Sequence, residues 1–410
     1  MAELAAAFPQ TRSYRIDSID FLRGLVMIIM ALDHTRDFFH SQAWLQDPLN
    51  PSTTTPWLYF TRWITHLCAP IFVFLAGTGG FFQSRRKSKT DLSAFLITRG
   101  LWLVIVEVVI INFAFSFDLR YSIIGLQTIW AIGISMIILG LVIWLPFTAI
   151  LAVGTLIVVG HNMLDFYEAT LPGPQTDPGW LYSLLHRPYF YELWDGHRLF
   201  ILYPFLPWAG LMMLGYCFGK LFLSYEGSRR KKMLLITGGC LILLFVMLRF
   251  TTRAGSSFHY GDPLFWSEQK NLLYSIFSFM NVQKYPPSLL FMCATIGIGL
   301  IILAFSGRIS GAFARFVIVF GRVPFFYYVL HFFLIHLLTA VFFLSRGHSL
   351  AEGLNPPDPM FPKFILPGEG YDLWVVYLVW AGIVLLLYPL CRQFSQYKSR
   401  NRDKKWLSYL

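Results

Sequence analysis

Residues 21–40 read FLRGLVMIIMALDHTRDFFH, and this stretch decides the class of fold. The apolar run from Gly24 to Leu32 is typical of the middle of a membrane-spanning helix. Residues 33–37, DHTRD, follow at once and bring four ionisable side chains into the same span. Because a charge near the middle of a bilayer costs several kcal/mol, such residues are candidates for function.

Similar apolar stretches recur along all 410 residues, of which 56% are hydrophobic and only 13% charged. A soluble domain usually carries about 25% charged residues, and the mean hydropathy here is +0.56. A β-barrel would show short alternating segments instead. The composition therefore predicts an all-α polytopic membrane protein of about ten transmembrane helices, with residues 1–410 forming one domain. The expected spans cover residues 21–40, 57–82, 96–117, 121–145, 147–161, 199–223, 233–250, 286–306, 316–344 and 372–391.

Two of these assignments depend on particular features of the sequence. The long apolar region 121–161 is divided into two spans at Leu145-Pro146, because proline interrupts a helix. Residues 316–344 are long for a single span, so we expect this segment to be tilted or broken.

The distribution of basic residues predicts the orientation in the membrane. With the N-terminus in the cytoplasm, most of the 33 Lys and Arg fall on the cytoplasmic side, as the positive-inside rule requires. Both termini are then cytoplasmic, and residues 392–410 form a basic tail that could also lie on the inner leaflet. The first 20 residues lack a signal-peptide core and cleavage site, so the first span is expected to remain attached. We expect a multi-pass protein of the plasma (inner) membrane.

Composition also argues against several other classes of function. The net charge of +11 is explained by cytoplasmic Lys and Arg, and no nucleic-acid-binding motif accompanies it. The five cysteines lie in or beside apolar stretches, without CxxC or His/Cys spacing. Neither a disulfide framework nor a metal site is therefore expected.

The first span carries the strongest candidates for function. Arg23 and His34 are eleven residues apart, which is about three helical turns and ~16 Å of rise, so both side chains share one face. Arg36 can reach the carboxylate of Asp33 or of Asp37 from the same helix. The three could also form no more than an ion-pair cluster where the helix leaves the membrane.

Two later spans carry further candidates, each of which also has a plain packing explanation. Arg62 and His66 are four residues apart and share a face; Arg62 could mark the interface, and His66 could bond a carbonyl. Glu107 is the deepest lone acid, so we expect it to have a partner or to be protonated.

Polar and aromatic residues in two other spans are weaker candidates. Gln127 and Trp130 could line a cavity or only hold helices together. Tyr327 and His331 are four residues apart and share a face, whereas His336 points elsewhere. Aromatic residues in spans are mostly core or interface residues, which leaves His331 as the better candidate of this group.

These residues fall within stretches that resemble a known family. SIDFLRGLVMIIMALDH resembles the start of the transmembrane acyltransferase superfamily, in which an Arg, ten residues and a His open the first span. The wider pattern resembles the bacterial branch of the heparan-α-glucosaminide N-acetyltransferase catalytic-domain family, a domain first catalogued without known function. The supporting stretches are RGLVMIIMALDHTRDFF, RWITHLCAPIFVFLAG, RGLWLVIVEVVI, GLQTIWAIG, YPFLPWAGLMMLGYCFG, KYPPSLLF and GRVPFFYYVLH.

The resemblance implies an acyl-CoA donor, usually acetyl-CoA, that enters from the cytoplasm. It implies an acceptor on the far side, often an amino or hydroxyl group of a sugar or glycan, and it leaves a homodimer possible. Arg23 is placed to meet the phosphates of CoA, and His34 can take a proton from the attacking acceptor. In animal lysosomal relatives the catalytic His lies further along, near His40, which is therefore the second choice.

The other candidates receive roles by analogy. Asp33, Asp37 or a neighbouring helix could orient the ring of the catalytic His. The expected contacts of the donor are Arg36, Arg62, His66, Gln127 and Trp130. The expected contacts of the acceptor are Glu107, Lys284, Tyr327 and His331.

Several alternatives remain open at the level of sequence. The basic tail 392–410 could steer anionic CoA or could serve topology alone. The acyl group could pass directly to the acceptor or first to a histidine. The intramembrane charges could instead line the substrate path of a transporter or flippase, although no repeat pairs two halves of the chain as in many transporters. A membrane scaffold is a third possibility, but it leaves the spacing of Arg23 and His34 without a purpose.

Overall fold

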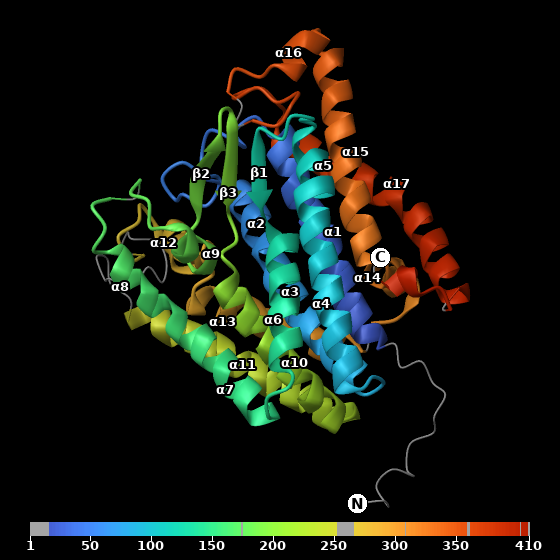
Figure 1. Cartoon of the computed structure of the whole chain (residues 1–410). Coiled ribbons are helices and arrows are strands. Elements are labelled where there is room, and N and C mark those ends of the chain that lie inside the picture. The colour runs from blue at the N-terminus through green and yellow to red at the C-terminus, as the bar shows by residue number, and fades with distance from the viewer. Residues whose placement is uncertain are drawn as a thin grey trace, which may run out of the picture.

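The computed structural model describes residues 16–173, 175–251, 266–307, 309–358, 361–401 and 403–408, and these residues are mostly helical (Figure 1). The principal helices and strands are α1 (Asp17–Phe39), α2 (Pro56–Ile64), α3 (Cys68–Ser84), α4 (Lys89–Val106), α5 (Asn112–Ser116), β1 (Ile123–Leu126), α6 (Thr128–Val142), α7 (Phe147–Gly160), α8 (Asp165–Glu168), α9 (Trp180–Leu185), β2 (Tyr189–Trp194), β3 (His197–Ile201), α10 (Phe205–Ser224), α11 (Gly227–Thr251), α12 (Leu272–Met280), α13 (Leu289–Ser306), α14 (Gly311–Arg322), α15 (Pro324–Ser345), α16 (Leu350–Leu354) and α17 (Leu373–Arg400).

The described chain contains eight helical segments that are long and apolar enough to cross a membrane. They are Pro56–Ser84, Lys89–Ser116, Phe147–Glu168, Phe205–Ser224, Gly227–Thr251, Leu289–Ser306, Pro324–Ser345 and Leu373–Arg400. Two expected spans are not among them, because residues 21–40 are rich in charge and residues 121–145 contain a helix of only 15 residues, α6. A multi-pass helical membrane protein is confirmed, whereas the count of ten and the orientation stay predictions.

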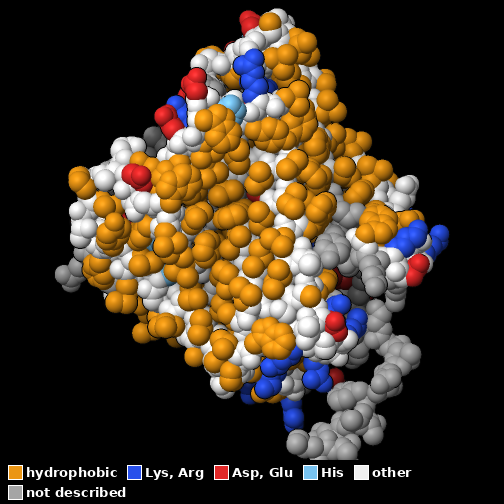
Figure 2. Space-filling view, in the orientation of Figure 1, with side chains coloured by type: hydrophobic (Ala, Val, Ile, Leu, Met, Phe, Trp, Pro, Cys, Tyr) orange, Lys and Arg blue, Asp and Glu red, His pale blue; other side chains and the backbone are white. Residues whose placement is uncertain are grey.

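The surface agrees with this assignment. Figure 2 shows a broad belt of hydrophobic side chains across the face of the molecule, with charged side chains gathered at its two ends. Lys and Arg dominate the lower end in this view. Apolar residues exposed in such numbers are expected where lipid, and not water, covers the protein.

The helix α1 lies at the centre of the fold and packs against α3, α14, α15 and α17 (Figure 1). Glycines allow the closest of these crossings. A Cβ atom added to Gly24 would collide with the carbonyl oxygen of Val317, and one added to Gly321 would collide with that of Asp20. Small residues at a crossing let two helix backbones approach closely within a membrane. This contact fixes the position of Arg23, which directly precedes Gly24.

A small sheet accompanies the helices of this mostly helical fold. Its strand order is β1-β3-β2, with β1 parallel to β3 and β2 antiparallel to β3. The two-residue turn Asp195-Gly196 joins β2 to β3, and Gly196 adopts the positive φ that favours such a turn. The expected spans 121–145 and 199–223 are therefore wrong at their starts, where the backbone is paired in strands before α6 and α10 begin.

The expected interruption of residues 316–344 is confirmed. The helix α14 ends at Arg322, and α15 begins at Pro324, because proline is accepted at the first position of a helix but not in its interior. At the other end of the chain, α17 continues to Arg400, so the first residues of the predicted tail extend the last helix.

Candidate active site

Two cavities lie along α1, one beside its C-terminal half and one beside its N-terminal half. The first, which we call the His34 cavity, has a volume of about 290 Å³. Its wall combines α1, α3, the sheet and the loop before α13. Its polar and charged lining includes Asp33, His34, Arg36, Asp37, Arg62, Asn112, Gln127, Thr128, Tyr203, Lys284, Tyr285, Tyr328 and Lys363.

A network of ion pairs forms one side of the His34 cavity. Arg36 Nη2 lies 3.0 Å from Asp33 Oδ1 and 2.6 Å from Asp37 Oδ1. Arg62 Nη1, on α2, lies 2.8 Å from the other oxygen of Asp33. The prediction that Arg36 reaches a carboxylate of its own helix is confirmed, and Asp33 additionally links α1 to α2. Asp33 thus holds two buried guanidinium groups at the edge of the cavity.

His34 is paired with His331 and not with an aspartate. His34 Nδ1 lies 2.7 Å from His331 Nε2, and the His34 ring stacks on Phe332 at a centroid distance of 4.2 Å. His331 Nδ1 lies 3.2 Å from the carbonyl oxygen of Tyr327, which can only accept a hydrogen bond. A neutral His331 therefore carries its proton on Nδ1 and accepts from His34 Nδ1–H, which leaves a lone pair on His34 Nε2.

The second cavity, which we call the Arg23 cavity, has a volume of about 460 Å³. Five cationic side chains and a single carboxylate, Asp20, lie among its lining residues; the cations are Arg23, Arg86, Arg99, Arg322 and Lys398. Arg23 Nη1 lies 3.2 Å from Asp20 Oδ1 and donates to the carbonyl oxygen of Gly321. An excess of positive charge at the mouth of a cavity attracts and holds anionic groups.

The two cavities adjoin near the middle of α1. Four residues, Met30, Phe72, Thr128 and Tyr328, line both of them. Met30 lies seven residues after Arg23 and four before His34, so all three project from one face of α1. The face predicted from the spacing of Arg23 and His34 thus runs from one cavity into the other.

Six of the predicted site residues lie away from the lining of either cavity. His66 is buried with its ring centroid 5.2 Å from that of Phe291. Glu107 Oε2 accepts a hydrogen bond from the backbone N–H of Trp130. His40 follows the last residue of α1, where its Nδ1 accepts from the backbone N–H of Gln42. The others, Trp130, Tyr327 and His331, are packed behind the cavity wall, and only His331 touches His34.

Sequence reasoning missed several residues of these cavities. Arg86 and Arg99 were explained by the predicted topology, and for the basic tail that holds Lys398 the steering of CoA was only one of three alternatives. Tyr285 and Tyr203 lie in the His34 cavity with ring centroids 5.2 Å apart. Burial alone would raise the pKa of the Tyr285 phenol, but the charges of Lys284 and Arg62 bring it below its usual value.

The fold and the cavities define a polytopic membrane protein with a basic cavity on one side, a charged cavity on the other and a histidine pair beside their junction. The family model described as "Heparan-alpha-glucosaminide N-acetyltransferase, catalytic" matches residues 15–250, more than half of the chain. The chain belongs to this family, which implies a membrane acetyltransferase type of function. A search of curated proteins finds no match. The matched region includes Arg23, His34 and Arg62 but ends before Lys284 and His331.

Proposed function

We propose that this protein transfers an acetyl group from cytoplasmic acetyl-CoA to an amino or hydroxyl group of an extracytoplasmic sugar or glycan. The observation that carries the proposal is the pair of cavities, which lie beside opposite halves of α1 and share four lining residues. Such an arrangement lets a donor and an acceptor meet inside the membrane without either crossing it. Family membership supports the acetyl donor.

The Arg23 cavity suits the donor. Guanidinium groups bind phosphate oxygens through paired, charge-assisted hydrogen bonds, and three arginines with Lys398 surround Arg23 here. The wall beyond these cations is apolar, with Met27, Leu75 and Phe95 among its residues, and would accept a narrow, largely uncharged arm. The cations thus hold the anionic end, and the cavity leads towards Met30 and Tyr328.

His34 is the proposed general base. Its Nε2 lone pair can take the proton from the acceptor nitrogen or oxygen as that atom bonds to the acyl carbon. The carbon–sulfur bond then breaks, and the proton on His34 is available to the departing thiolate. His331 is a positioning residue in this scheme, because its hydrogen bond to His34 Nδ1 keeps the proton of His34 on that nitrogen. The aromatic and charged residues of the His34 cavity, including Tyr285 and Lys284, surround the acceptor.

A relay through acetylated His34 would use the same nitrogen. Incubation with radiolabelled acetyl-CoA in the absence of acceptor, followed by denaturation, separates the two routes. We expect direct transfer, and therefore no label on the denatured protein, because both substrates can reach the shared segment at once. Label that is retained by the wild-type protein and lost in His34→Ala would replace direct transfer with the relay.

The proposal is tested first by binding. Acetyl-CoA should raise the Tm of the purified protein, since a ligand at 100 times its Kd stabilises by ~2.7 kcal/mol. The binding should weaken with salt because the contacts are ionic. An unchanged Tm at millimolar acetyl-CoA, together with counterflow of a sugar in proteoliposomes, would replace this proposal with a transporter.

Gly79 provides a sharper test of the donor route. It lines the Arg23 cavity, and a Cβ atom added there meets nothing within 4 Å. Gly79→Leu should therefore fill the cavity without disturbing helix packing. We expect at least ~10-fold weaker acetyl-CoA binding, the loss expected when bulk replaces a bound group, with a Tm close to that of the wild type.

The matched control is Gly239→Leu, at an exposed position of α11 where an added Cβ also has open space. It should leave both acetyl-CoA affinity and Tm unchanged. If Gly79→Leu binds acetyl-CoA as well as Gly239→Leu does, the donor does not occupy this cavity.

The role of His331 predicts a split between kinetic constants. His331→Leu removes the acceptor for His34 Nδ1–H. Because His331 only positions the base, kcat should fall by ~10- to 100-fold, less than for loss of the base itself, while KM for acetyl-CoA stays unchanged. His331→Gln, which can still accept a hydrogen bond, should recover part of kcat. Equal loss in both variants would show that His331 serves packing alone.

A further inference from the structure

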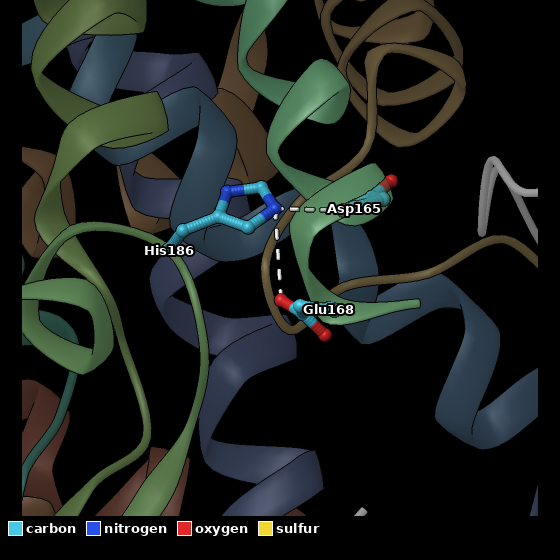
Figure 3. Close-up of side chains that lie close together, drawn as sticks. All are labelled: Asp165, Glu168 and His186. Atoms are coloured by element: carbon cyan, nitrogen blue, oxygen red, sulfur yellow. Dashed lines mark hydrogen bonds and ion pairs between the residues drawn. The ribbon is translucent and has the colours of Figure 1, made fainter. Parts of the chain in front are cut away.

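Three ionisable side chains converge away from both cavities, at the end of the helical segment Phe147–Glu168 (Figure 3). Asp165 and Glu168 lie on the single turn α8, and His186 follows α9. His186 Nε2 lies 2.7 Å from Asp165 Oδ1 and 3.9 Å from Glu168 Oε1. One ligand atom from each residue lies within 4.8 Å of the other two.

The three groups are largely removed from water. The side chains of His186, Asp165 and Glu168 are 0%, 3% and 19% exposed, respectively. The imidazole Nε2 carries at most one proton, and at these distances that proton serves Asp165 and does not reach Glu168. Burying two carboxylates beside one imidazole is costly unless further positive charge compensates them. Arg187 Nε pairs with Glu168 Oε2 at 3.9 Å and supplies part of this charge.

The donor atoms match what a zinc-class ion requires. Zinc binds histidine nitrogen and carboxylate oxygen at about 2.0–2.2 Å, which separates tetrahedral ligand atoms by about 3.4 Å. The two measured separations, 2.7 and 3.9 Å, bracket this value. A nitrogen donor among two oxygens favours a transition-metal dication over calcium or magnesium, which prefer oxygen alone. The ion's two positive charges would balance the two carboxylates.

Neighbouring groups already hold these ligands in place. Asn162 Nδ2 donates to the second oxygen of Asp165 at 3.0 Å. Tyr182 Oη donates its single hydrogen to the carbonyl oxygen of Leu164 at 2.7 Å and lies 3.3 Å from Glu168 Oε1. Hydrogen bonds of this kind orient the ligands in metal sites.

A separate observation also points to a missing ligand. His161 is 3% exposed, and its ring centroid lies 5.4 Å from that of His186. In the described part of the chain, Nδ1 of His186 and at least one ring nitrogen of His161 have no hydrogen-bond partner, and the backbone of Pro287 approaches the His161 ring. Unsatisfied buried nitrogens are expected where water or an ion belongs.

We propose that Asp165, Glu168 and His186 form a structural binding site for one divalent transition-metal ion of the zinc class, with water in a fourth position. This departs from the expectation of no metal, since no short ligand spacing in the sequence marks the site. The ion would join α8 to the segment that leads into β2. Phe190 of β2 and Phe200 of β3 line the His34 cavity, so the site braces one wall of that cavity from outside.

The test measures metal on the full-length protein, purified without a histidine tag or chelator. Elemental analysis should find about one zinc per chain, and cobalt exchanged into the site should give visible d–d absorption bands. Glu168→Gln and Asp165→Asn keep the size of each side chain and should each lower the metal content at least ~10-fold. Chelation should lower the Tm of the wild type, and zinc should restore it.

The matched control is His348→Ala. His348 also lies between two carboxylates, with Nε2 2.7 Å from Glu369 and Nδ1 3.8 Å from Glu352, but it uses different nitrogens and lies in an exposed loop. This variant should keep its metal. A wild-type protein with less than about 0.1 zinc per chain and no cobalt spectrum, or variants that keep full metal content, would overturn the proposal. The cluster would then be a metal-free network of hydrogen bonds and ion pairs.

Discussion

Replacing His34 with alanine should lower acetyl transfer by at least ~10²-fold and up to ~10⁴-fold, the range that a general base contributes. The loss follows from the geometry of the histidine pair, in which His331 fixes the His34 proton on Nδ1 and leaves Nε2 as the base. The measurement is the steady-state rate of labelled acetyl transfer to an aminosugar by the purified protein.

Two controls separate chemistry from folding in this experiment. The His34→Ala variant should still bind acetyl-CoA, because the proposed contacts of the acetyl-CoA phosphates are the cations of the Arg23 cavity. This cavity lies beside the other half of α1, away from His34. Arg23→Ala should show the reverse pattern, with weaker acetyl-CoA binding and little loss of kcat once the donor is saturating. A His34→Ala protein that transfers acetyl groups at the wild-type rate would remove His34 from the mechanism.

Replacing Asp33 with alanine should have the largest effect on stability. Asp33 accepts from Arg36 on its own helix and from Arg62 on α2, and the side chains of these arginines are only 4% and 13% exposed. Removing one partner of a buried ion pair typically costs ~3–5 kcal/mol, because the remaining charge is left buried without compensation. We expect a lower Tm and poor recovery of folded protein in detergent.

The neighbouring acid provides the matched control. Among the described residues, the carboxylate of Asp37 forms an ion pair with Arg36 alone, and the Asp37 side chain is 30% exposed. Asp37→Ala should therefore destabilise the protein by a much smaller amount. Combining Asp33→Asn with Arg62→Met should recover part of the lost stability, since a paired removal leaves no lone charge. Equal Tm values for Asp33→Ala and Asp37→Ala would show that the network contributes little to folding.

Local periodicity predicted those features of this protein that depend on neighbours along one helix. The shared face of Arg23 and His34, the pairing of Arg36 with carboxylates of its own helix and the interruption before Pro324 each follow from spacing within one segment. The stacking of Tyr327 on His331 has the same origin, with ring centroids 5.4 Å apart.

The remaining features depend on contacts between distant segments, which periodicity does not encode. His34 and His331 are 297 residues apart in the sequence, and β1 pairs with β3 across more than seventy residues. The run YFYELW-DG-HRLFI does carry a hairpin signal, an Asp-Gly turn between aromatic-rich stretches. Because this run is highly apolar and adjoins a predicted span, the hairpin was not predicted. The basic lining of the Arg23 cavity was not predicted, because the positive-inside rule already explains arginines at the predicted cytoplasmic ends of spans.

The most direct test of the central claim is the position of the donor in a structure of the complex with acetyl-CoA. The phosphates of acetyl-CoA should lie among Arg23, Arg86 and Arg99, and its thioester should lie beside Met30 and Tyr328. An acceptor atom that is hydrogen-bonded to His34 Nε2 should then be within about 4 Å of the thioester carbonyl carbon. A thioester that lies outside both cavities and far from His34, while His34 is still hydrogen-bonded to His331, would contradict the account.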